Sequence, residues 1–449
     1  MQRKLSADAR AYLFLCLACL LVYFPVLTLD FQRGWDDGWM VLNHYTVFGF
    51  TPENLKAVFT EFYAAQYGPV NEVIYMAIYA AFGGYNPVAF HIYPLLLHIV
   101  NSCLVLLFVR QLVGGRTDVV TARWVSFLTA LLFAVHPLQV ETIAWISASK
   151  IPLYTLFTLM AMLTYIRYIR TGKIGFYIGT FLLFVCAFGS KEQCVVLPVT
   201  LMLLDWALDR TSLACGENKG DNPVEKRSWG YLLLEKLPFL FFALFAGLAT
   251  YVNQSAHLID QWAGYPFGQR MVFACYSLVE YLGKLAFPVN LLYLYPFPMA
   301  PGKELPVHFF VYPVVFAALI LFLVKVVKRR HWFVIFGLLF FLVNMALMLH
   351  IVAMSRFSII ADRYVYLGSA GIFLIAAWYG VLWFRKRTGT ARKGIIAVAV
   401  CYLLYLGVYA HFRTYTWKDS ETLKKEFREL INEDLLKQTP TPETQNSKL

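Results

Sequence analysis

The chain has 449 residues, of which 59% are hydrophobic and only 15% are charged. Soluble domains are about 45–50% apolar and about 25% charged, so this composition excludes a soluble enzyme, a disordered chain and a fibrous repeat. The net charge of +12 does not indicate nucleic-acid binding, because the basic residues lie in short stretches between apolar runs. The sequence therefore predicts an all-α, polytopic membrane protein.

Apolar runs follow one another along the whole chain, and we expect eleven of them to cross the membrane. The first run comes after a basic start and has no small-residue cleavage site, so we expect an uncleaved anchor. The predicted spans cover roughly residues 11–29, 88–112, 122–137, 152–170, 174–189, 194–209, 231–252, 307–327, 332–350, 364–385 and 394–411.

Basic residues set the expected orientation. With the N-terminus in the cytoplasm, most Lys and Arg residues fall in cytoplasmic segments, and the two large loops, 30–87 and 253–306, fall outside. We expect interfacial helices in both loops. Residues 270–288 are apolar but carry Glu280 and Lys284, so we predict an interfacial or re-entrant helix there. The predicted membrane domain is 1–411, and 412–449 is an external, partly disordered tail.

Adjacent carboxylates follow the first span, in the sequence Arg33-Gly-Trp-Asp-Asp-Gly-Trp39. Two like charges side by side raise the pKa of one of them unless a cation or hydrogen bonds hold them. Asp36 and Asp37 therefore suit a general base, or ligands for a divalent cation such as Mg²⁺ or Mn²⁺. The alternative is a solvated turn, because Gly-Trp and Asp-Gly are common turn sequences.

Three other polar groups fall on the same predicted side. They contain Glu141, the pair Lys191-Glu192, and Arg363, and a Lys or an Arg at the membrane surface suits a phosphate. Each group has a plain alternative: a Pro-broken helical hairpin, a turn, and an interfacial Arg–Tyr anchor. A transport path would instead place ionisable residues mid-span, where this chain has few. The one-sided cluster favours an enzyme that takes a lipid-phosphate donor from the bilayer.

Together these motifs resemble those of the GT-C glycosyltransferases. The closer resemblance is to the transmembrane and tetratricopeptide-repeat O-mannosyltransferases and their bacterial relatives, in the family's order over about residues 12–420. The motifs are Trp35-Asp36-Asp37 with Asn43, Tyr67-Gly-Pro69, Phe90-His91, Leu97-His98, Phe133-Ala-Val-His-Pro137 with Glu141 and Trp145, Ser190-Lys-Glu-Gln193, Asp362-Arg-Tyr-Val-Tyr-Leu367 with Ser369, and Trp417-Lys-Asp419.

The resemblance implies a GT-C-like fold and an inverting transfer of a sugar from a polyprenyl-phosphate carrier to an acceptor on the outer face. It also implies that the first-loop Asp is the base and that basic residues hold the leaving phosphate. Three departures leave the sugar and the acceptor open: Gly68 stands where the family often has Arg, Ser149-Lys150-Ile151 stands where it often has Arg-Lys-Asp, and no tetratricopeptide repeats follow in this sequence.

The predicted function is thus a hexosyl- or pentosyltransferase with a polyprenyl-phosphate donor, a protein or glycan acceptor, and a bacterial inner membrane rather than the endoplasmic reticulum as its location. The alternatives are a lipid-linked saccharide polymerase, ligase or flippase, or a membrane scaffold. The predicted catalytic residues are Asp36, Asp37 and Glu141, with the first two as possible metal ligands. The predicted substrate-binding residues are Trp35, His91, His136, Lys150, Lys191, Glu192, Arg363, Tyr364 and Tyr366.

Overall fold

The computed structural model describes residues 6–63, 66–211, 225–262, 265–328, 331–351 and 358–430. Over these ranges the chain is helical, with two isolated β-bridges and no sheet. The predicted all-α class is confirmed. Residues 431–449, half of the predicted tail, lie outside the described residues.

Each predicted apolar run forms a helix. The bounds differ from the expected ones by a few residues, because Pro137 ends one run and a 3₁₀ turn over Asp362–Val365 precedes another. The helices are α1 (Ala7–Tyr23), α4 (Pro87–Val113), α5 (Val119–Val135), α7 (Lys150–Thr171), α8 (Ile174–Phe188), α9 (Leu197–Ala207), α10 (Trp229–Trp262), α12 (Val311–Lys328), α13 (Trp332–Met345), α14 (Ser369–Arg385) and α15 (Gly389–Thr414).

Length separates these helices into two groups. Six of them, counted with their 3₁₀ extensions, are long and apolar enough to cross a bilayer, and α5 with residues 137–144 makes a seventh if that pair, bent by 55°, is one span. The helices α8, α13 and α14 are apolar but shorter, and α9 has 11 residues. The polytopic membrane character is confirmed, whereas the count of eleven spans stays a prediction.

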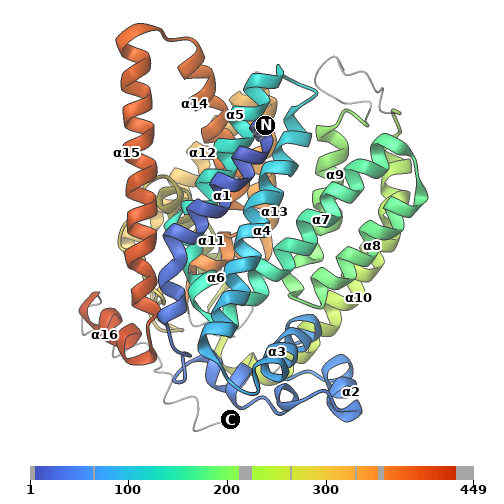
Figure 1. Ribbon diagram of the computed structural model, residues 1–449, viewed down its shortest axis with the longest axis vertical. Coiled ribbons are helices and arrows are strands. Elements are labelled where there is room, and N and C mark those ends of the chain that lie inside the picture. Colours follow the sequence, from blue (N-terminus) through green and yellow to red (C-terminus); the bar gives the residue numbers. More distant parts are fainter. Residues whose placement is uncertain are drawn as a thin grey trace, which may run out of the picture.

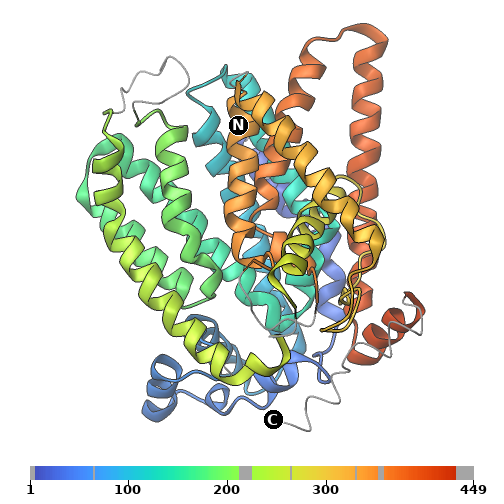
Figure 2. The same ribbon diagram turned by 180° about the vertical axis from the view of Figure 1, so that it is seen from behind.

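The helices stand roughly side by side as one bundle (Figure 1). The start of α1 is at one end. At the other end are α2 (Pro52–Thr60), α3 (Pro69–Phe82), α6 (Val140–Ala144) and α16 (Ser420–Leu430). The view from behind places α11 (Phe267–Ala286) against the bundle beside α12 (Figure 2). The helices expected in both large loops are therefore present.

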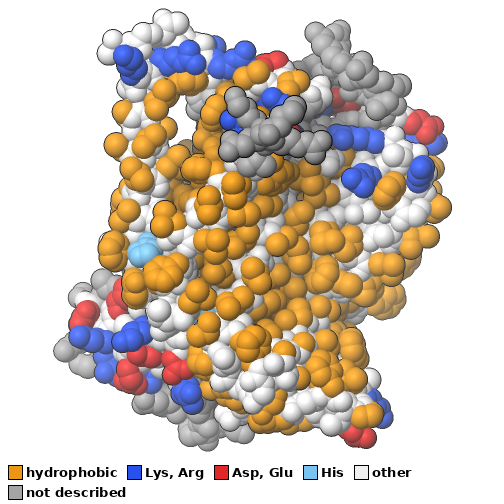
Figure 3. All heavy atoms as spheres, in the orientation of Figure 1, with side chains coloured by type: hydrophobic (Ala, Val, Ile, Leu, Met, Phe, Trp, Pro, Cys, Tyr) orange, Lys and Arg blue, Asp and Glu red, His pale blue; other side chains and the backbone are white. Residues whose placement is uncertain are grey.

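A broad hydrophobic surface covers the middle of the bundle, and charged side chains gather toward its ends (Figure 3). Many large apolar side chains of α12 and α15 are exposed, including Leu321 and Val398. Exposed apolar side chains over whole helices are expected of a protein whose solvent is lipid. The surface therefore agrees with the membrane assignment.

Helices α13 and α14 touch through two glycines. A Cβ added to Gly337 would meet the backbone carbonyl oxygen of Gly371, and one added to Gly371 would meet that of Gly337. Small residues at a helix crossing let backbones approach closely in membranes. This contact fixes α14, and with it the 3₁₀ turn that carries Arg363.

The chain after residue 411, in the predicted tail, contacts the first loop. Helix α15 runs on to Thr414, and the following turn is hydrogen-bonded to the first loop: Gln32 Nε2 donates to the carbonyl of Trp417 at 2.7 Å, and Gly34 N donates to Ser420 Oγ at 3.0 Å. Hydrogen bonds thus hold residues 415–420 against the first loop.

The orientation yields a direct expectation. A reporter inserted after residue 220 should read cytoplasmic, and one inserted after residue 60 should read external, because the basic residues favour that arrangement. Alkaline phosphatase and green fluorescent protein fusions at the two positions measure this. The reverse pattern would place Asp36 and Arg363 on the cytoplasmic side and contradict the predicted orientation.

Candidate functional site

The first loop leaves α1 through a 3₁₀ turn and then bends at Trp35-Asp36-Asp37. Asp37 is 1% exposed. Its Oδ2 accepts from Gln32 N at 2.8 Å, and its Oδ1 accepts from Ser147 N at 2.8 Å and from the Ser147 hydroxyl. Burial raises the pKa of Asp37 to about 6, against the opposing effect of these donors. Asp37 therefore joins the first loop to the segment between α6 and α7.

Asp36 is more exposed than Asp37 and has fewer hydrogen-bond donors around it. It is half-buried, and its Oδ1 accepts from the Trp39 indole N–H at 3.2 Å. Among the described residues, that indole is the one side-chain donor to its carboxylate. An oxygen is therefore left to accept a proton from a substrate hydroxyl, which is the geometry that a general base needs.

A buried ion pair positions Arg363. The Glu141 side chain is 1% exposed, and its Oε2 accepts from Arg363 N at 2.8 Å while its Oε1 binds the guanidinium. The guanidinium also lies 5.1 Å from the ring centre of Trp145. Burial acts to lower the pKa of Arg363, but the Glu141 carboxylate outweighs it and raises that pKa. Since 22% of the Arg363 side chain stays exposed, the remaining N–H groups can bind an anion.

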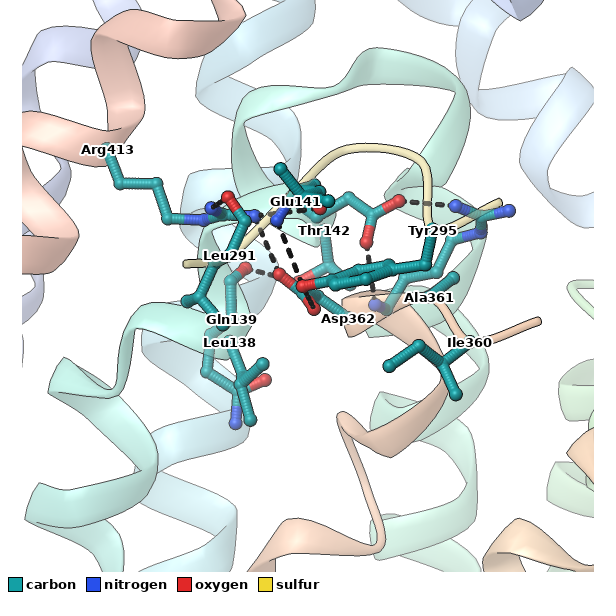
Figure 4. Close-up of polar contacts among 12 residues, drawn as sticks. Leu138, Gln139, Glu141, Thr142, Leu291, Tyr295, Ile360, Ala361, Asp362 and Arg413 are labelled. Carbon is teal, nitrogen blue, oxygen red and sulfur yellow. Dashed lines mark hydrogen bonds and ion pairs between the residues drawn. The ribbon is translucent and has the colours of Figure 1, made fainter. Parts of the chain in front are cut away.

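A second buried ion pair lies beside Glu141, and Figure 4 shows its members, Asp362 and Arg413, next to the Glu141 side chain. Asp362, fully buried, accepts from Tyr295 OH at 2.8 Å and lies 2.6 Å from Arg413 NH2. Arg413 also donates to the backbone carbonyls of Leu291 and Leu292. Burial raises the pKa of Asp362 to about 6, although Arg413 acts to lower it. This pair ties α15 and the 291–295 segment to the turn that presents Arg363.

We expect Arg413→Ala to lower the free energy of unfolding by about 3–5 kcal/mol, because it leaves the Asp362 carboxylate buried without its cation. The matched control is Arg385→Ala, whose partner Asp118 lies in solvent, so little change is expected. Thermal unfolding in detergent measures both. Equal, small effects would show that the buried pair does not hold this side of the site.

Lys150, Lys191 and Glu192 converge on the same region. Lys191 Nζ lies 3.0 Å from Glu192 Oε1, and Lys150 Nζ donates to Gln66 Oε1 at 2.6 Å. Lys150 and Glu192 line the same small cavity. Burial would raise the pKa of Glu192, but Lys191 and Lys150 outweigh it and hold that pKa below its usual value. We call Lys150, Lys191 and Arg363 the basic cluster.

The two predicted substrate-binding histidines contact backbone groups of the protein itself. His91 faces the carbonyls of Pro87 and Ala144, and His136 faces the carbonyl of Leu285 and the N–H of Leu138.

The three aromatic residues predicted to bind substrate do not all lie at the site. The buried Tyr366 hydroxyl is 2.8 Å from His98 Nδ1, inside the bundle. Trp35 packs 5.7 Å from Tyr293 and 6.4 Å from Trp145, and the Tyr364 ring lies 4.8 Å from the Arg363 guanidinium carbon. Trp35 and Tyr364 therefore border the site, whereas Tyr366 supports the fold behind it.

A divalent ion held jointly by Asp36 and Asp37 does not fit this arrangement. Both oxygens of Asp37 already accept hydrogen bonds from Gln32 and Ser147. Among the described residues, no three His, Cys, Asp or Glu side chains are grouped as metal ligands. The dependence on Mg²⁺ or Mn²⁺ stays a prediction from the sequence, and no step below uses a metal.

Sequence reasoning did not assign roles to Asp362, Arg413 or Tyr295. Asp362 adjoins Arg363, but nothing in the sequence pairs it with a residue at the end of the last span. The one available signal was Arg413 itself, a cation inside an otherwise apolar helix end, which calls for a buried partner. Glu72 and His44, in the first loop, were also given no role; they are taken up below.

No family model and no curated protein matches the chain. Two solved structures align with nearly all of it: the apo oligosaccharyltransferase of Archaeoglobus fulgidus (TM-score 0.46, 94% of this chain) and the oligosaccharyltransferase AglB of that organism in complex with an inhibitory peptide and a dolichol-phosphate (TM-score 0.44, 93% of this chain). Each is 12% identical, and the chain spans 56% of their length.

Proposed function

We propose that the protein is a GT-C-like membrane glycosyltransferase. It moves a sugar from a polyprenyl-phosphate carrier to an acceptor hydroxyl on the extracytoplasmic face, with inversion. The observation that carries this proposal is a set of contacts around the first loop: Trp39 donates to Asp36 and lines a cavity with Lys150 and Glu192. Trp145 lies against both Trp35 and the Arg363 guanidinium. We expect this end of the bundle to lie at the level of the lipid headgroups. A carboxylate beside several cations suits a reaction that takes up a proton and releases a phosphate.

The transfer has three simultaneous parts. The Asp36 carboxylate removes the proton of the acceptor hydroxyl, and the hydroxyl oxygen forms a bond to the anomeric carbon of the donor. The bond from that carbon to the phosphate oxygen breaks, and its electron pair stays on the lipid phosphate. Attack from the face opposite the phosphate inverts the anomeric configuration.

The basic cluster acts on the charge that develops on the departing phosphate. Lys191 and Lys150 offer ammonium groups, and Arg363 offers the N–H groups that Glu141 does not use. Donors fixed before the reaction stabilise such charge without reorganisation. Glu141 and Asp37 are buried, so in this mechanism they position Arg363 and the first loop rather than touch the substrate.

The proposal is tested by the lipid that accompanies the protein. We expect mass spectrometry of the protein purified in mild detergent to detect a polyprenyl phosphate or its glycosylated form, at a ratio to protein that falls in Arg363→Ala. Phospholipids alone, with no polyprenyl species in either preparation, would contradict the donor class.

A further inference from the structure

A small cavity lies beneath the first loop, on the side of the basic cluster. Its lining includes His44, Gln66, Asn71, Glu72 and Lys150, and its volume is about 20 Å³. A cavity of roughly 10–15 Å³ is needed to hold one water molecule. The cavity therefore has room for a group the size of a hydroxyl.

One polar atom in the cavity wall, His44 Nε2, lacks a hydrogen-bond partner among the described residues. The His44 side chain is 4% exposed, and its Nδ1 is 2.8 Å from the Thr46 hydroxyl. Among the described residues, Nε2 has no hydrogen-bond partner, since Glu72 Oε2 is 3.6 Å away, beyond hydrogen-bond distance. A buried polar atom without a partner costs about 1–3 kcal/mol, so a ligand or water that satisfies it is favoured.

Glu72 complements this atom. Burial raises the pKa of Glu72 to about 7, although Thr46 and Lys150 act to lower it. Burial also lowers the pKa of His44 to about 4, so the ring is neutral near pH 7 and Nε2 either donates or accepts. A hydroxyl both donates and accepts, so a single one within hydrogen-bond distance of both Nε2 and the Glu72 carboxyl group, reached from the cavity side, satisfies both.

The cavity adjoins the transfer site at two points. Lys150, a member of the basic cluster, lines it. Trp39 lines it as well and donates its indole N–H to Asp36. The Trp39 ring is stacked with Tyr63, 6.1 Å between centres, which gives the cavity an aromatic wall. A sugar whose phosphate is held by the basic cluster and whose anomeric carbon faces Asp36 would lie over this cavity.

We propose that the His44–Glu72 cavity is a specificity subsite that receives one hydroxyl group of the transferred sugar. The inference rests on the proposed function, and it adds the residues that select the sugar. A site built to hydrogen-bond a substrate hydroxyl rejects the analogue that lacks it, by up to about 10⁴–10⁵-fold, because its buried polar groups are then unpaired. We expect the subsite to exclude a substituent as large as an acetamido group, because the cavity volume is only about 20 Å³.

The experiment uses the full chain and a polyprenyl-phosphate hexose that it turns over, together with the monodeoxy forms of that donor. We expect one monodeoxy donor to lose at least about 10²-fold in kcat/KM with the wild-type protein. In Glu72→Ala, transfer from the parent donor should fall, and the preference over that monodeoxy donor should drop below about fivefold. The matched control is Glu53→Ala, in exposed α2 of the same loop, which should keep the preference.

Failure of the subsite can be distinguished from failure of the proposed function. Equal use of all the monodeoxy donors by the wild-type protein would overturn the subsite, and would indicate a cavity that holds water only, while leaving the transfer reaction intact. A full preference retained in Glu72→Ala would overturn it as well. Failure of the wild-type protein to use any polyprenyl-phosphate hexose would instead overturn the proposed function, and the subsite with it. The wild-type series decides the matter even where Glu72→Ala does not fold.

Discussion

Replacing Asp36 by Asn is expected to lower the rate of sugar transfer by about two to four orders of magnitude, the usual contribution of a general base. Asn has nearly the same shape and can still accept from the Trp39 indole, but its amide cannot take the acceptor proton. Donor binding should be largely kept, because the basic cluster is unchanged. Steady-state transfer and donor binding, measured on the same preparation, separate the two effects.

Two neighbours serve as controls for Asp36→Asn. Asp30→Asn changes an exposed carboxylate of the same loop, paired with Arg33 at 3.8 Å, and should leave transfer nearly unchanged. Asp37→Asn should act mainly on stability, because Asp37 is buried and accepts from Gln32 and Ser147. Full transfer by a folded Asp36→Asn protein would show that Asp36 is not the base.

Replacing Arg363 by Ala is expected to lower kcat/KM for the donor by about 10²–10³-fold, the effect of removing one preorganised donor from a developing oxyanion. The variant also leaves Glu141 buried without its cation, so a loss of stability would accompany the loss of activity. Kinetics at several donor concentrations, with thermal unfolding on the same samples, distinguish the two causes.

Arg363→Lys separates phosphate binding from folding. Lys keeps a positive charge for Glu141 but lacks the planar fork that binds a phosphate with two N–H groups. We expect it to restore most of the stability and only part of the activity. Arg385→Ala, at the other end of the bundle, should change neither. If Arg385→Ala and Arg363→Ala reduce donor use equally, Arg363 has no particular role at the phosphate.

The positions of the helices could be predicted because apolar runs of membrane length are a strong signal. Their ends could not, since Tyr364 and Val365 read as the start of an apolar run but belong to a 3₁₀ turn that precedes α14. The first-loop pair could also be found from the sequence. The different environments of Asp36 and Asp37 could not be predicted, because only the contact of Ser147 with Asp37 shows which carboxylate is buried.

At the site, the features that the sequence could not predict are contacts between side chains far apart along the chain. Glu141 and Arg363 were both singled out, but the sequence did not predict their ion pair, which joins positions 222 residues apart and on which the proposed positioning role of Glu141 rests. The Asp362–Arg413 pair and the His44–Glu72 cavity likewise depend on side chains brought together by tertiary packing. A single sequence contains no signal of such contacts beyond the cost of leaving each charge buried alone.

The central claim, that Asp36 and the basic cluster transfer a sugar from a lipid phosphate, is tested most directly by following both products of one turnover. The purified chain is mixed in liposomes with a labelled polyprenyl-phosphate sugar and an acceptor fraction from the outer face. The account predicts that polyprenyl phosphate and a glycosylated acceptor of inverted anomeric configuration form in equal amounts, and that Asp36→Asn forms neither at a comparable rate. Retention of configuration, or equal product formation by the folded Asp36→Asn protein, would contradict it.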